Sequence, residues 1–331
     1  MNQLLVPNEN GLYCEKGDFY IDPWKPIKTA LITHGHSDHA TSDHNEYFSS
    51  ESTVPILKHR LGQINITGVK FSQKIKFKDV TVSFHPAGHV LGSSQIRVDD
   101  GEQVWVVSGD YKRTFDPTCE PFEIVKCDTF ITEATFALPI YRWKPTRKVI
   151  EEIYSWWEAN KKENKASVLF CYALGKAQRI LAELMHFTNE SIYIHGAMEP
   201  LINLYRDAGI KLLPTISATE QPKGFDFSDK LIIAPTSAFR STWMRRFGDS
   251  SNAFASGWMT VRAQKTQGGY DKGFVLSDHC DWYDLIQTIK DTQASTVYVT
   301  HGRSNVLVRY LHEELGINSF ALKTEFKDDE D

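Results

Sequence analysis

The stretch that decides the fold is "ALITHGHSDHAT", residues 30–41. An apolar run leads directly into four side chains of metal-ligand type within six positions, namely His34, His36, Asp38 and His39. A tight loop at the end of a strand can fold neighbouring side chains together. The first two histidines can then face one ion while the aspartate and the last histidine turn toward a second. Because imidazole with carboxylate favours zinc or manganese over magnesium, we expect two divalent transition-metal ions, Zn²⁺ or Mn²⁺.

Composition sets the class of protein. The 331 residues leave room for two domains, and 41% hydrophobic with 24% charged residues is ordinary for a globular chain. A net charge of −5 excludes a generally basic nucleic-acid binder, so such binding needs a local basic groove. The five cysteines include no CxxC pair, which favours reduced thiols. The first ten residues resemble neither a secretion signal nor a membrane anchor, so we expect a cytoplasmic protein without membrane contact.

The chain contains two regions that differ in their pattern of strand-like and helical runs. Residues 1–135 are rich in short strand-like runs such as "VTVSFHPA", whereas residues 145–235 alternate helical and strand-like runs. The run "RKVIEEIYSWWEANKK", residues 147–162, places its apolar positions on one helical face. Alternation of this kind predicts parallel βα units. Strand-like and helical runs also form the C-terminal part of the chain. We therefore expect the segment of alternating helices and strands to be inserted between two halves of the first domain.

Further motifs accompany the opening stretch. "THGHSDHA" matches the HxHxDH signature of the metallo-β-lactamase fold. "YIDPW" lies shortly before it, and "PAGHVLGSS", "SGDYKR" and "VTHG" follow it in the order typical of that fold. The resemblance implies an α/β chain folded as an αββα sandwich. It implies a first metal held by His34, His36, His89 and Asp110. It implies a second metal held by Asp38, His39, Asp110 and His301, with Asp22 orienting the metal loop.

Other motifs narrow the resemblance to the β-CASP nucleases. "ITEATFA" puts Glu133 at acidic motif A, "LSDHCDW" puts His279 at motif B, and His301 stands at motif C. "CYALGKAQRILAEL", residues 171–184, resembles a segment of the β-CASP insert. The resemblance implies a metallo-β-lactamase domain built from residues 1–140 and 273–331, with a β-CASP cap over residues 141–272.

Both ends of the chain resemble the bacterial DNA-ligase-associated exonucleases, through "GLYCEKGDFYIDPW" and "GGYDKGFVLSDHCDW". This resemblance implies a DNA exonuclease in repair that acts on single-stranded DNA alongside an ATP-dependent DNA ligase and a helicase. The β-CASP group also includes the DNA cross-link repair nucleases, and likeness to them implies that the DNA strand is shortened from its 5′ end.

Three residues are expected to take part in catalysis. Asp38 would act with the metals, and His279 would donate to the phosphate or protonate the leaving group while Glu133 fixes its tautomer. Two alternatives stay open. Glu133 can be a plain surface or capping carboxylate, and His279 can be part of a helix N-cap.

Residues 234–259 mix hydroxyl, arginine and tryptophan side chains. Arginine forks suit phosphates and tryptophan offers a stacking face for an unpaired base, so we expect substrate contacts from Arg240, Trp243, Arg245 and Arg246. The alternative is a solvated helix face with core aromatics.

Two other functions stay open. Histidine at motif C, His301, accompanies RNA processing in the eukaryotic branches, which favours an RNA-processing β-CASP ribonuclease. A non-catalytic scaffold for nucleic acid or protein is disfavoured. Catalytically inactive members of the family usually lack some of the metal-ligand residues, whereas every expected ligand position is filled here.

Overall fold

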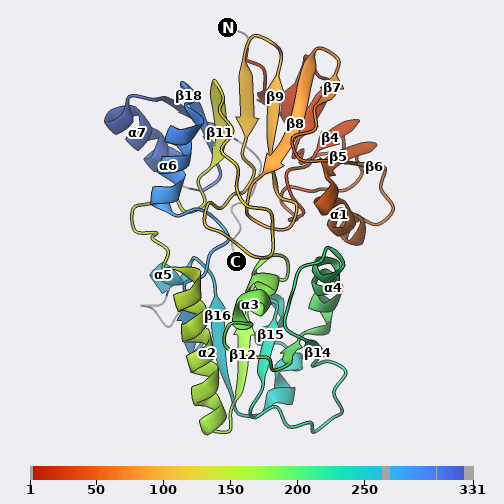
Figure 1. Ribbon diagram of the computed structural model, residues 1–331, viewed down its shortest axis with the longest axis vertical. Helices are drawn as coiled ribbons and strands as arrows, with labels where there is room; N and C mark the ends of the chain where they lie inside the picture. The colour runs from red at the N-terminus through yellow and green to blue at the C-terminus, as the bar shows by residue number, and fades with distance from the viewer. Residues whose placement is uncertain (1–2, 263–268, 303, 324–331) are drawn as a thin grey trace. The chain divides into compact units, whose positions relative to one another are not determined.

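The computed structural model describes residues 3–262, 269–302 and 304–323. The chain divides into two compact units, Met1–Ile140 with His279–Asp331, and Tyr141–Asp278 (Figure 1). The second expected boundary, after residue 272, differs from the observed one. It falls inside β17 (Lys272–Phe274), which pairs in parallel with β16 (Ser250–Ala255) of the second unit. The chain therefore returns to the first unit six residues later than predicted, at His279.

The first unit contains two sheets. One has the strand order β1-β2-β3-β4-β5-β6, with β1 (Val6–Asn8), β2 (Gly11–Cys14), β3 (Phe19–Ile21), β4 (Thr29–Leu31), β5 (Glu46–Ser50) and β6 (Ile66–Val69). The other has the order β19-β18-β11-β10-β9-β8-β7, with β7 (Ile75–Phe77), β8 (Val80–Pro86), β9 (Ser94–Asp99), β10 (Val104–Val107), β11 (Thr129–Glu133), β18 (Thr296–Thr300) and β19 (Asn318–Ala321).

Apolar side chains join these two sheets and cover their outer faces. Phe19 of the first sheet and Phe84 of the second belong to one buried cluster between them. Side chains alternate along a strand, so Val106 of β10 faces the other way and packs with α6 (Trp282–Thr292) and α7 (Ser304–Leu315). On the first sheet, Tyr47 packs with Leu57 of α1 (Val54–Leu61). The unit is thus a mixed α/β arrangement with helices outside two packed sheets.

The second unit is built on one six-stranded sheet in the order β14-β13-β15-β12-β16-β17, and all its strand pairs are parallel. Its remaining strands are β12 (Ala166–Phe170), β13 (Ile192–Ile194), β14 (Thr215–Ser217) and β15 (Leu231–Ala234). Its α-helices are α2 (Thr146–Lys162), α3 (Lys176–Leu184), α4 (Glu199–Asp207) and α5 (Met259–Arg262). The expected alternation of helices and parallel strands is confirmed. Within the described ranges, no helix is long and apolar enough to cross a membrane.

A large-to-small change between the two sheets should destabilise the first unit. Phe84 is 0% exposed and lies in the shared cluster, so Phe84→Ala should cost about 3–5 kcal/mol of unfolding free energy through lost burial and a cavity. The matched control is Phe115→Ala, because Phe115 is 71% exposed and its loss should change stability little. Urea unfolding measures both variants, and equal midpoints would contradict this packing.

Candidate metal centre

One edge of the first unit collects the ligand-type side chains. The strands β10, β11 and β18 are parallel neighbours, so their carboxyl ends meet. Glu133 is the last residue of β11, and the chain continues from β10 to Asp110 and from β18 to His301. In the other sheet β3 runs parallel to β4, which places Asp22 beside the loop that starts at Thr33. Residues far apart in the sequence are therefore gathered at one edge by the strand order.

Asp22 contacts the metal-ligand loop from the neighbouring strand. Its Oδ1 accepts the backbone N–H of Thr33 at 2.8 Å, and its Oδ2 accepts the Thr33 hydroxyl at 2.5 Å. The same Oδ2 lies 2.8 Å from His39 Nδ1. A carboxylate on Nδ1 leaves the other ring nitrogen, Nε2, to face the centre of the site. These contacts tie the loop to Asp22, and the role of Asp22 in supporting a metal site stays a prediction.

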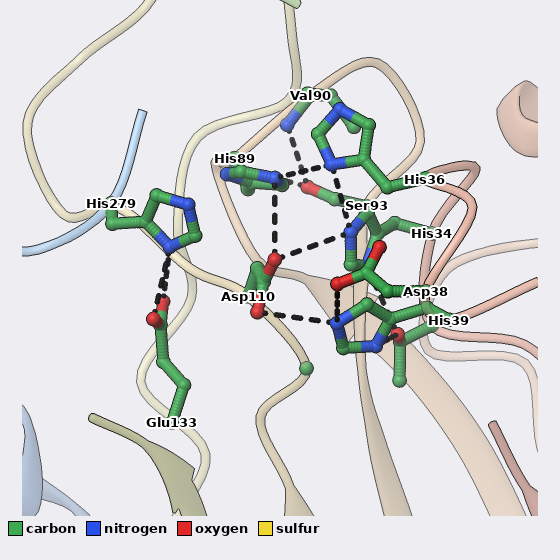
Figure 2. Close-up of polar contacts among 12 residues, drawn as sticks. His34, His36, Asp38, His39, His89, Val90, Ser93, Asp110, Glu133 and His279 are labelled. Carbon is green, nitrogen blue, oxygen red and sulfur yellow. Dashed lines mark hydrogen bonds and ion pairs between the residues drawn. The ribbon is translucent and has the colours of Figure 1, made fainter. Parts of the chain in front are cut away.

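A first group of possible ligands comprises His34, His36, His89 and Asp110, whose ligand atoms all lie within 4.8 Å of one another (Figure 2). His36 Nδ1 is 3.1 Å from the Nε2 atoms of both His34 and His89. Asp110 Oδ2 is 3.4 Å from His34 Nε2 and 3.7 Å from His89 Nε2. Two atoms bound to one tetrahedral zinc at about 2.0–2.1 Å lie about 3.3–3.4 Å apart, so this donor set fits a metal ion.

A second group comprises His34, Asp38 and His39, whose ligand atoms likewise all lie within 4.8 Å of one another. His39 Nε2 lies 3.4 Å from Asp38 Oδ2 and 3.4 Å from Asp110 Oδ1. The His301 ring stacks on His39 with centroids 5.3 Å apart. The two oxygens of Asp110 therefore face different groups, Oδ2 toward the first and Oδ1 toward the second (Figure 2).

The electrostatics of His34 and His301 suit metal binding. Burial lowers the pKa of His34 well below its usual range, and burial together with neighbouring His39 lowers the pKa of His301. Both imidazoles are therefore neutral near pH 7 and keep a lone pair for a metal. Burial opposes charge on His39, but the carboxylates of Asp38 and Asp110 raise its pKa well above the ordinary value.

Asp110 is a carboxylate in this setting. Burial alone would raise its pKa, but His39 and then His279 hold the pKa well below its ordinary value. Buried Asp110 is therefore an anion whose two oxygens are available to both groups.

Glu133 and His279 form a pair beside the first group. His279 Nδ1 is 2.9 Å from both carboxylate oxygens of Glu133, and the His279 ring centroid is 4.7 Å from that of His89. The two alternatives left open by the sequence are wrong. Glu133 is 3% exposed, so it is no surface carboxylate, and the N-cap of α6 is Asp281, which accepts from Asp284 N.

The residues predicted to contact the substrate belong to the second unit. Arg240 and Arg245 are exposed, and Arg245 lies in a short 3-10 helix, Thr242–Phe247. Arg246 instead donates to the carbonyl of Ala218, and half-buried Trp243 packs against His195 and Phe247. Arg246 lies over the Trp243 ring at 5.6 Å from its centroid, and the role of the four side chains stays a prediction.

Sequence reasoning missed residues that hold the site through their backbones or by distant contacts. Thr33 ties the loop to Asp22, and its position directly before His34 is the sequence feature that could have indicated this role. Arg60 of α1 donates to the carbonyl of Gly35 at 2.6 Å, and Tyr111 N donates to Glu133 Oε1 at 3.0 Å. The local sequence around Arg60 and Tyr111 contains no pattern that predicts these contacts.

No family model matches the chain. The chain is 28% identical over 323 residues to a "Probable DNA ligase" of Opitutus terrae, covering 96% of the chain and 31% of that protein. It is 32% identical over 148 residues to "Transcription termination factor FttA" of Methanosarcina mazei, covering 43% and 22%. It is 33% identical over 139 residues to an "RNase J-like protein" of Methanocaldococcus jannaschii, covering 39% and 31%. The chain thus spans a third or less of the length of each curated relative.

A solved structure shares the fold. A protein of unknown function from Enterococcus faecalis superposes with a TM-score of 0.60 over 90% of this chain and 79% of that one, at 12% identity. At this identity the likeness concerns the fold alone.

Removing the carboxylate of Asp22 should weaken metal binding. Asp22→Ala leaves Thr33 and His39 without their shared acceptor, and the loss of such an outer partner typically costs 10–100-fold in affinity, so we expect about that loss. Competition with a chromogenic chelator measures it. Asp43→Ala, an exposed carboxylate in the same region, is the control, and equal affinities in the two variants would contradict the role of Asp22.

Proposed function

We propose that this chain is a metal-dependent nuclease of the β-CASP group of metallo-β-lactamase-fold proteins. The observation that carries the proposal is the placement of Asp110 between two histidine groups with the Glu133–His279 pair beside it. The names of the relatives, a DNA ligase, a termination factor and an RNase J-like protein, support work on nucleic acid.

The fold is consistent with this proposal. Two sheets that share a core and carry helices on their outer faces fit the αββα sandwich of metallo-β-lactamases. The second unit, Tyr141–Asp278, would be the β-CASP cap, with its end at residue 278 in place of the expected 272.

We assign two divalent ions, zinc or manganese, to the centre. The first would be held by His34, His36, His89 and Asp110, and the second by Asp38, His39, Asp110 and His301. Such a pair supplies activation of water and neutralisation of charge on the phosphate. The protein fixes the ligands through Asp22 and keeps the centre largely buried.

His279 would act on the leaving oxygen. Glu133 accepts from Nδ1–H, so the proton that His279 can give to the leaving oxygen is the one on Nε2. The carboxylate stabilises the imidazolium that holds this proton, and the backbone N–H of Tyr111 keeps Glu133 in place. Phosphodiester cleavage would then break the bond to an oxygen that leaves protonated.

The substrate we propose is single-stranded DNA, shortened from its 5′ end during repair alongside an ATP-dependent DNA ligase and a helicase. Support comes from the match of 96% of the chain to part of a protein named for DNA ligation. The exposed arginines Arg240 and Arg245 would contribute phosphate contacts, with Trp243 and Arg246 supporting them. RNA processing is the second candidate, favoured by the RNase J-like relative and by His301 at motif C.

Metal analysis tests the two-ion assignment. Protein purified without chelator should carry close to two transition-metal equivalents per chain, and Asp38→Ala should retain about one while losing cleavage. Folded and active protein with a stoichiometry near zero would contradict the proposal.

Cleavage assays test the reaction and the substrate. Matched DNA and RNA oligonucleotides labelled at either end, with manganese or zinc, should show DNA shortened from the 5′ end. His279→Ala should slow cleavage by about 10²–10⁴-fold, the usual worth of a positioned acid. Faster digestion of RNA would promote the second candidate. Binding of nucleic acid without cleavage under any metal would favour the scaffold.

A further inference from the structure

One segment of the first unit contacts two of the loops that carry possible metal ligands. It runs from Ser50 at the end of β5 through a short 3-10 helix, Glu51–Thr53, into α1. The two loops are the one between β4 and β5, which carries His36, and the one between β8 and β9, which carries His89. His36 Nδ1 and His89 Nε2 lie 3.1 Å apart (Figure 2). Both loops must therefore keep their positions if these rings are to meet at one ion.

Arg60 of α1 holds the loop that carries His36. Its Nη1 donates to the carbonyl of Gly35 at 2.6 Å, and that carbonyl belongs to the peptide bond between Gly35 and His36. An arginine side chain stays charged at any ordinary pH, so this hydrogen bond is charge-assisted and stronger than one between neutral groups. The half-buried Arg60 side chain thus fixes the plane of the peptide bond that directly precedes His36.

The helix gives Arg60 a firm base. Leu57 is 0% exposed and packs in one buried cluster with Ala30 and Ala40, which stand on either side of the ligand loop. Residues three apart on a helix are neighbours on its surface, so Arg60 follows Leu57 on nearly the same side of α1. The apolar cluster that fixes both ends of the loop therefore also fixes the helix from which Arg60 reaches it.

The beginning of the same segment holds the loop that carries His89. Ser50 Oγ donates to the carbonyl of Gly92 at 2.6 Å. Glu120 accepts the Ser52 hydroxyl on Oε1 at 2.7 Å and the backbone N–H of Gly92 on Oε2 at 2.9 Å. Gly92 lies in the same loop as His89, between β8 and β9. The segment therefore binds the backbones of both histidine loops, one near each of its ends.

The charge of Arg60 does not itself favour a metal ion. Burial lowers the pKa of Arg60 and the carboxylate of Asp38 raises it, so the guanidinium lies within the electrostatic reach of a residue of the second group. A cation close to a site for divalent cations weakens metal binding by repulsion. Any contribution of Arg60 in favour of metal binding must then come from geometry, through its hydrogen bond to Gly35.

We propose that Arg60 is a positioning residue for the first metal ion, and that it acts by holding the peptide bond that precedes His36. The segment Ser50–Leu61 then serves as the outer support of His36 and His89 together. The inference rests on the proposed function only through the assignment of an ion to the first group. Every contact that carries it lies within the first unit.

Zinc affinity in variants that keep one of the two ions tests the proposal. In Asp38→Ala, which should keep the first ion, adding Arg60→Met should weaken zinc binding about 10–100-fold, the usual effect of losing an outer partner. In a protein with both His36→Ala and His89→Ala, which should keep the second ion, Arg60→Met should not weaken binding, because the ring that Arg60 positions is gone. Competition with a chromogenic chelator measures each affinity.

Three further variants serve as controls. Arg60→Lys keeps the charge and a donor, so it should recover part of the affinity that Arg60→Met loses. Lys58→Met removes an exposed cation from the same helix and should leave the affinity for the first ion unchanged. If Arg60→Met does not fold, Ser52→Ala gives the same comparison through a neutral change at the other loop, and it should weaken the first ion alone.

The possible results separate this inference from the proposed function. Unchanged or tighter binding of the first ion in Arg60→Met would reject the positioning role, since repulsion would then be the whole effect of Arg60. Equal weakening in both backgrounds would indicate a general loss of stability and would also reject it. Selective weakening in a protein that binds two ions but cleaves no nucleic acid would retain the positioning role and reject the proposed function. A wild-type protein that binds no ion would reject both.

Discussion

The centre depends on one buried carboxylate, Asp110, whose two oxygens face two groups of histidines at 3.4 Å. A carboxylate buried in this way is tolerated because His39 and His279 offset its desolvation. Its position requires a close approach of the strand end to the ligand loop. Gly109, at φ +55, allows it, since a Cβ there would lie 2.7 Å from the Cβ of Thr33.

The backbone of Tyr111 extends this constraint to Glu133 and to the segment that carries His279. Its N–H donates to Glu133 and its carbonyl accepts from Cys280 N, so Asp110, Glu133 and His279 are held through one residue. The parallel order of β10, β11 and β18 places the segments that carry these residues side by side.

The ligand loop could be predicted from sequence because its donors lie within six residues, where strand and turn geometry are local. His89, Asp110 and His301 could be named only through resemblance, since strand order brings them together. The roles of Arg60 and Tyr111 could not be predicted, because their contacts join distant segments or involve main-chain atoms. The boundary at 272 was misplaced because edge pairing of β17 is likewise non-local.

The central claim is that Asp110 lies between two metal ions. Anomalous diffraction from crystals grown with zinc or manganese, recorded above and below the absorption edge of the metal, tests it most directly. The account predicts two anomalous peaks about 3.5–4 Å apart on either side of the Asp110 carboxylate, one near His36 and His89 and one near Asp38 and His39. The absence of both peaks from these histidines in fully loaded protein, or a single peak bound to one oxygen of Asp110, would contradict it.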